Sequence, residues 1–156
     1  MTPVVPDLSL PLRVILYCAE EVDRQQDEQL AVGWLCTAWA EAVRRRAADP
    51  VLTVETVEAL GKLVSPPMNA SGFRQGMVRV GSHLCPPPTE VRPALVKLLS
   101  PETLATRSPD KVYYEFQLIH PFNDGNGRTG KVVLNWLNNS LDAPIMPSNW
   151  FHCANP

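Results

Sequence analysis

The chain has 156 residues, of which 45% are hydrophobic, a size and composition typical of one globular domain. Its 14 basic and 16 acidic side chains leave a net charge of −2, which argues against a dedicated nucleic-acid surface, because such a surface needs a basic excess. The longest early apolar run is too short to span a bilayer, so we expect no membrane segment.

The first three predicted helices follow from apolar periodicity. Apolar residues recur with a helical period over 11–27 and again over 30–46. Thr53 is expected to cap a third helix, which Ser65-Pro66-Pro67 should stop.

Three more helices are predicted in the second half of the chain. Thr89 is expected to cap a fourth helix that ends near Ser100-Pro101. Ser108, followed by a proline at the first helical position, opens a fifth helix that meets Pro121. A sixth is expected over about 127–139, and the rest of the chain shows no clear period.

One segment alternates in the manner of a strand, between Gly76 and Gly81 and ahead of a proline run at 86–88. The alternating residues are Met77, Val78, Arg79 and Val80. We therefore predict one short β-hairpin in a mainly α protein, a bundle of about six helices forming a single domain over 1–156.

The cysteines indicate no metal site. Cys18, Cys36, Cys85 and Cys153 form no C-x-x-C pair, so neither a zinc knuckle nor a thioredoxin motif is indicated. No secretory signal precedes them, and the simplest interpretation is a reduced, cytoplasmic protein.

The nine residues 120–128 read HPFNDGNGR and fall between the last two predicted helices. The first N–H groups of a helix have no partner inside it and attract anions. Gly125 and Gly127 let the backbone approach an oxyanion closely, and Asn126 can donate a side-chain amide. Arg128 adds a planar, charged fork suited to phosphate. We predict an anion hole for nucleotide phosphates at the start of the last helix.

Two further residues of this turn carry reactive groups. Asp124 can supply the single carboxylate that Mg²⁺ accepts beside phosphate oxygens, although an aspartate beside glycine is also common in solvated turns. His120 can be neutral at physiological pH and so accept the proton of an attacking hydroxyl.

The nonapeptide resembles the signature of the Fic family, H-P-F-x-[DE]-G-N-G-R-x-x-[RK], and the predicted hairpin is similar to the family's flap, so the likeness covers roughly 53–139. It implies an enzyme of the Fic/Doc superfamily, a protein adenylyltransferase that moves AMP from ATP to a Ser, Thr or Tyr hydroxyl and releases pyrophosphate. The likeness also implies Mg²⁺ held by Asp124, His120 as the base, Arg128 on the phosphates and a target protein docked on the flap.

Two positions depart from the family pattern. Lys131 stands where many members have a second arginine that orients the nucleotide, so it keeps the charge but loses the fork. Phosphoryl transfer, as in Doc toxins, is therefore an alternative, although those toxins carry lysine where this chain has Gly127. Glu41 partly fits the family's inhibitory helix, which would require it to reach Lys131 or Arg128; otherwise it faces solvent and regulation could come from an antitoxin-like chain. A catalytically silent peptide-binding module and a transferase for small molecules are further alternatives.

Overall fold

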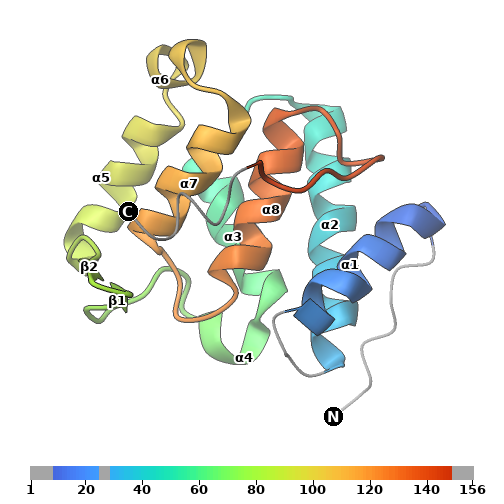
Figure 1. The fold of residues 1–156 in the computed structure, drawn as a ribbon, viewed down its shortest axis with the longest axis horizontal. Coiled ribbons are helices and arrows are strands. Elements are labelled where there is room, and N and C mark those ends of the chain that lie inside the picture. Colours follow the sequence, from blue (N-terminus) through green and yellow to red (C-terminus); the bar gives the residue numbers. More distant parts are fainter. Residues whose placement is uncertain (1–8, 25–28, 149–156) are drawn as a thin grey trace.

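The computed structural model describes residues 9–24 and 29–148 (Figure 1). The predicted end of the first helix at 25–27, the tail from residue 149 and Cys153 lie outside the described residues. Within that part the fold is mainly helical, as predicted. The helices are α1 (Leu12–Arg24), α2 (Leu30–Ala48), α3 (Val54–Val64), α4 (Pro66–Asn69), α5 (Pro88–Leu98), α6 (Pro101–Thr106), α7 (Pro109–Ile119) and α8 (Asn126–Leu137), and the two strands are β1 (Arg79–Val80) and β2 (His83–Leu84).

Two of the predicted helix caps are confirmed. The hydroxyl of Thr53 accepts a hydrogen bond from the N–H of Thr56 at 3.2 Å, which starts α3. The hydroxyl of Ser108 accepts from the N–H of Lys111 at 3.2 Å, with a proline in the first turn of α7. Each cap satisfies one N–H group that the first turn of a helix leaves without an internal partner.

Two short helices were not predicted, and one cap was wrong. Ser65 does end α3, but the following proline starts α4 in place of a loop. Ser100 accepts a hydrogen bond from Thr103 and opens α6, so it is a beginning as well as an end. Thr89 lies inside α5, which begins at Pro88 because proline already has the φ angle of a helix.

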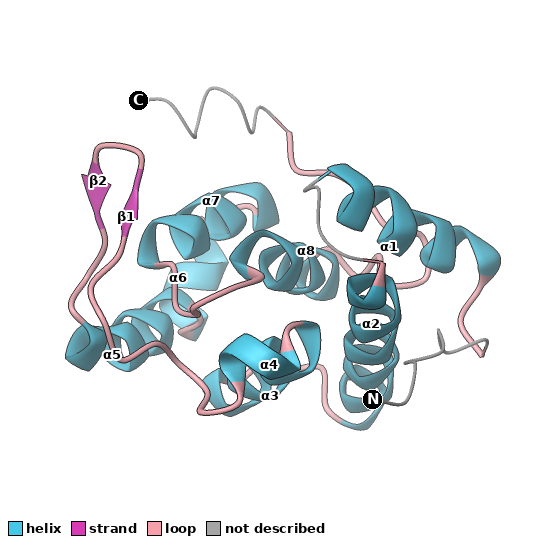
Figure 2. Cartoon of the chain, turned by 90° about the horizontal axis from the view of Figure 1, so that it is seen from below, coloured by secondary structure: helices cyan, strands magenta, loops and turns pink. Residues whose placement is uncertain are grey.

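Helix α8 occupies the middle of the bundle, between α7 on one side and α2 on the other (Figures 1 and 2). Nearly all of its residues are buried, polar ones included. Around it the core is formed by side chains from α1, α2, α3, α5 and α7. The first turn of α8 is therefore held in place by packing on several sides.

The hairpin is antiparallel, with Val80 opposite His83, and projects from the helices beside α5 (Figure 2). It is shorter than the predicted run, although the N–H of Cys85 still donates to the carbonyl of Val78 at 3.1 Å. Met77 and Leu84 are among its exposed apolar side chains. The hairpin is thus an exposed element attached to a rigid helical body.

Two further expectations concern membrane-spanning helices and the cysteines. Among the described helices, none combines the length and the apolar content that crossing a membrane demands. Cys18, Cys36 and Cys85 are buried, and none of them forms a disulfide within the described residues.

Candidate functional site

The site is built on the six-residue turn, 120–125, that joins α7 to α8. His120 ends α7 with a left-handed backbone, φ 50°, and its N–H donates to the carbonyl of Phe116 at 3.0 Å. This conformation is uncommon for residues other than glycine and persists where surrounding contacts hold it. It ends the helix at the histidine and lets the chain turn back toward α8.

Phe122 anchors the turn in the core. Its side chain is fully buried and packs against Phe73, with ring centroids 5.3 Å apart. A methyl group added to Gly61 of α3 would lie 2.0 Å from the ring, so the glycine is what admits the phenylalanine. The position of the turn is therefore fixed by core packing.

The side-chain amide of Asn126, expected to donate to an anion, instead bonds to the backbone of Phe122. Its Oδ1 accepts from the N–H of Phe122 at 2.9 Å, and its Nδ2 donates to the Phe122 carbonyl at the same distance. The residue is almost completely buried. Asn126 thus closes the turn with its amide, and only its backbone N–H is left for an anion.

Gly125 is the residue before the first turn of α8, with φ 71°, and no side chain caps this helix. A Cβ at Gly125 would lie 2.7 Å from Cγ1 of Val64, so both the backbone angle and the space require glycine. Gly127 lies within the first turn of α8 and needs no unusual conformation. The helix therefore begins with backbone N–H groups that no side chain caps, the kind of helix start that attracts anions.

Asp124 is held by α3 and α8 through one of its two carboxylate oxygens. Oδ2 accepts from the hydroxyl of Ser65 at 2.6 Å and from Nη2 of Arg128 at 3.2 Å. Oδ1 accepts no hydrogen bond from a described residue, and the side chain is 41% exposed. One oxygen is thus fixed by donors while the other faces outward.

The backbone of Asp124 is fixed as well. Asn69, fully buried in α4, donates to the carbonyl of Asp124 at 2.8 Å and accepts from its N–H at 3.2 Å. This side chain also donates to the carbonyl of Gly61 at 2.9 Å. The unpredicted helix α4 therefore positions the acidic residue.

These contacts suit a hard cation that takes most of its ligands from elsewhere. No group of three or more metal-ligating side chains occurs in the part of the chain that the structure describes. A single outward carboxylate oxygen is what Mg²⁺ uses when phosphate and water supply its other ligands. Asp124 fits that role.

Arg128 lies at the bottom of a pocket of about 270 Å³. Only 2% of its side chain is exposed, and Nη1 lies 3.5 Å from the carbonyl of Val64. The pocket is lined by Ala31, Trp34, Ser65, Pro67, Met68, Asp124 and Arg128. Arg128 and Asp124 thus share this pocket, whereas His120 lies outside its lining, at the far end of the turn.

Lys131 is not at the pocket. Its ammonium group donates to the carboxylate of Glu21 on α1, and both side chains are at least nine-tenths buried. Burial lowers the pKa of Lys131, and the charge of Glu21 opposes that shift. The cation expected on the phosphates is therefore neutralised by a buried acid in this conformation.

Glu41 bonds to arginines of its own helix and not to Lys131 or Arg128, the two contacts that an inhibitory role would require. Its carboxylate accepts from Arg44 at 3.0 Å and from Arg45 at 2.7 Å, three and four residues later on the same helix. These two guanidinium groups lower the pKa of Glu41 to about 2. Glu41 lines a separate pocket between α2 and α3, with Lys62, and that pocket shares no residue with the one at Arg128.

The imidazole of His120 is suited to accept a proton. Its pKa is lowered by burial, raised by the backbone of Gln117 and lowered again by the charge of Arg74. The ring atom Nδ1 is buried and makes no hydrogen bond of good geometry with a described residue. The other ring nitrogen is then the one that can face a substrate, and the ring is neutral at physiological pH.

Several residues at the site were missed by the sequence interpretation. The position of Glu21 could have been recognised from the sequence, because it lies on the same face of α1 as the buried residues Val14, Cys18 and Val22. An acidic residue on a buried helix face indicates a buried partner of opposite charge. Ser65 and Asn69 had none, since they lie 59 and 55 residues before Asp124 in unremarkable sequence.

Comparison with known proteins identifies similar sequences. The family model described as Fic/DOC family matches residues 51–138. A probable protein adenylyltransferase of Aquifex aeolicus is 37% identical over 71 residues, which are 41% of this chain and 22% of that protein. The protein adenylyltransferase Fic of Drosophila erecta is 33% identical over 78 residues, 46% of this chain and 16% of the relative. The chain thus spans less than a quarter of the length of these relatives.

Proposed function

Because the chain belongs to the Fic/DOC family, we propose that it is a protein adenylyltransferase that moves AMP from ATP to a Ser, Thr or Tyr hydroxyl of a target protein. The observation that carries this proposal is the single turn between α7 and α8. It joins a neutral histidine, an aspartate with one free oxygen and an uncapped helix N-terminus.

The phosphates of ATP would lie at the start of α8. The backbone N–H groups after Gly125 point outward there, and the helix dipole adds positive potential. Arg128, at the bottom of the neighbouring pocket, adds a fixed positive charge. Mg²⁺, when bound at Oδ1 of Asp124, would offset phosphate charge. These groups hold the nucleotide and exclude water from one side of it.

His120 would act on the incoming hydroxyl. The accessible ring nitrogen accepts the hydroxyl proton while that oxygen bonds to the α-phosphorus. The bond from the α-phosphorus to the bridging oxygen breaks, and pyrophosphate leaves with that oxygen. The exposed hairpin at residues 77–80 would dock an extended segment of the target by strand addition, since its outer edge offers backbone donors and acceptors.

Phosphoryl transfer is the second candidate function, and the position of Lys131 supports it. A cation expected to orient the distal phosphates is instead bonded to Glu21, so one restraint on the direction of ATP is absent here. A reversed nucleotide would present its γ-phosphorus to the same hydroxyl. A regulatory chain of the antitoxin kind and a cytoplasmic location remain predictions of the sequence.

Intact-mass spectrometry separates these candidates. The protein is incubated with ATP, Mg²⁺ and a lysate of its source cells, and modified proteins are identified by their mass increase. AMP adducts support the proposal, and phosphate adducts support the second candidate. A complete lack of adducts in the presence of bound ATP contradicts both and favours a silent binding module.

A further inference from the structure

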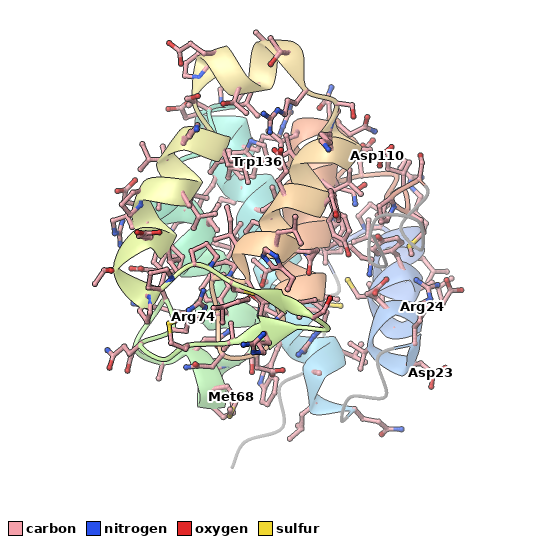
Figure 3. All side chains as sticks on the ribbon, turned by 60° about the vertical axis from the view of Figure 1, so that its left-hand side comes forward. Asp23, Arg24, Met68, Arg74, Asp110 and Trp136 are labelled. Carbon is pink, nitrogen blue, oxygen red and sulfur yellow. The ribbon has the colours of Figure 1, made fainter. Side chains whose placement is uncertain are left out.

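Arg74 is a buried cation that the proposed chemistry leaves without a role. It lies between α4 and the hairpin, at the base of the hairpin (Figure 3), and only 2% of it is exposed. Burial lowers the pKa of this guanidinium. No carboxylate pairs with it among the described residues, so its charge is compensated by carbonyl dipoles alone.

The guanidinium joins the hairpin to the catalytic turn. Nη1 donates to the carbonyl of Gly76, just before the hairpin, at 2.8 Å, and Nη2 donates to that of Pro86, just after it, at 2.6 Å. Nε donates to the carbonyl of His120 at 2.6 Å, and Nη2 also donates to that of Ile119 at 3.1 Å. One planar group therefore closes the base of the hairpin and caps the C-terminus of α7.

The backbone of Arg74 adds a further link, because its N–H donates to the carbonyl of Pro121 at 2.9 Å. Arg74 thus bonds to the carbonyl of His120 and to those of both its neighbours, Ile119 and Pro121. An apolar side chain could fill the same space without the desolvation penalty of a buried charge. A guanidinium fork, with five N–H donors in a fixed plane, can make all four of these bonds to three separate segments at once, whereas an ammonium group has only three donors.

We propose that Arg74 is a positioning residue that couples the flap to His120: it fixes the left-handed backbone of the histidine and the base of the hairpin together. This inference rests on the proposed function for its role in transfer. A target segment docked on the hairpin would then present its hydroxyl at a set distance from the imidazole. The positive charge at the end of α7 also interacts favourably with the helix dipole.

Two backbone amides report the two ends of this link. The N–H of His120 bonds to Phe116, and the N–H of Cys85 bonds to Val78 in the hairpin. Hydrogen exchange measures the opening of each locally. In the wild-type protein at low denaturant, we expect both amides to show the same opening free energy and the same denaturant dependence. Independent exchange of the two amides would overturn the coupling, and this result needs no variant.

Arg74→Lys keeps the charge but cannot reach four carbonyls, and Arg74→Gln removes the buried charge as well, which favours folding of that variant. We expect either variant to raise exchange at His120 and Cys85 together by about tenfold, with the core amide of Trp39 unchanged. Arg92→Lys is the matched control, since Arg92 lies over the Phe73 ring at 5.2 Å but contacts neither the hairpin nor His120. A rise at one end only, no rise, or an equal rise at Trp39 would contradict the proposal.

Kinetics give the second measurement. The Arg74 variants should lower kcat for protein labelling by about tenfold and leave the KM for ATP unchanged, because the phosphates are held by other groups. A raised KM for ATP at unchanged kcat would contradict a positioning role. If the wild-type protein labels nothing, the proposed function fails, and the exchange experiment still decides whether Arg74 joins the flap to His120.

Discussion

Lys131 on α8 and Glu21 on α1 form a buried ion pair. Glu21 also accepts from Arg24 at 2.9 Å, while the ammonium of Lys131 lies 5.9 Å from the ring centre of Tyr113. The pair links the first helix to the helix that carries the anion hole. It also withholds from the pocket a cation that the sequence predicts on the nucleotide.

Removing one partner of this ion pair should destabilise the protein. Glu21→Gln leaves the ammonium buried without its full counter-charge, and we expect the free energy of unfolding to fall by about 3 kcal/mol. Denaturant unfolding measures this. Glu20→Gln, at the exposed neighbouring position, is the control and should have little effect. Equal stability of the two variants would mean that the ion pair contributes nothing.

The same pair should compete with ATP. In Glu21→Gln the ammonium is free to turn to the phosphates, so we expect ATP to bind several-fold more tightly by calorimetry. Glu41→Gln should leave ATP affinity unchanged, because its carboxylate is held by Arg44 and Arg45 away from the site. Tighter binding in Glu41→Gln but not in Glu21→Gln would contradict this account and support the inhibitory alternative for Glu41.

His120 should be needed for transfer but not for binding. His120→Asn removes the base and keeps a residue that tolerates the left-handed backbone, so the turn should survive. We expect the rate of labelling to fall by about 10²–10⁴-fold, with ATP affinity retained. Labelling at the wild-type rate would remove this histidine from the mechanism.

The pH profile follows from the environment of His120. Burial lowers the pKa of the imidazole below its ordinary value, so the ring stays neutral at pH values where a free histidine is already charged. The labelling rate should therefore begin to fall at a lower pH than it would with a free histidine as the base. For stability the sign is the same, since protonating this ring disfavours the folded state as the pH falls. A decline that begins well above pH 7 would contradict a lowered pKa.

Asp124→Asn should raise the Mg²⁺ concentration needed for half-maximal labelling, because the free oxygen loses its charge. Ser65→Ala removes one of the two donors to Oδ2 and should raise it less, since Arg128 still holds the carboxylate. Mg²⁺ titrations of both variants test whether Asp124→Asn needs more of the metal than Ser65→Ala. Overlapping curves for wild type and Asp124→Asn would make Asp124 a structural turn residue.

Local signals predicted the fold better than they predicted the contacts of the site. The Ser-Pro pairs at 65, 100 and 108 all begin helices, yet only the last was interpreted in that way. Ser100 and Ser108 cap their helices through the hydroxyl, whereas the hydroxyl of Ser65 donates to Asp124. The burial of Phe122 depends on Gly61 of α3 and on the ring of Phe73, both far from it in the sequence. Ser65, which bonds to Asp124, and Glu21, which pairs with Lys131, lie 59 and 110 positions away in the sequence. Only tertiary packing brings these residues together.

Labelling with two forms of ATP tests AMP transfer most directly. The wild-type protein and His120→Asn are each incubated with Mg²⁺, source-cell lysate and ATP that carries the radioactive label on either the α- or the γ-phosphorus. We expect wild-type protein to label proteins from the α-labelled form only, and His120→Asn to label from neither. Transfer of the γ-label, or equal α-labelling by the variant, would contradict AMP transfer with His120 as the base.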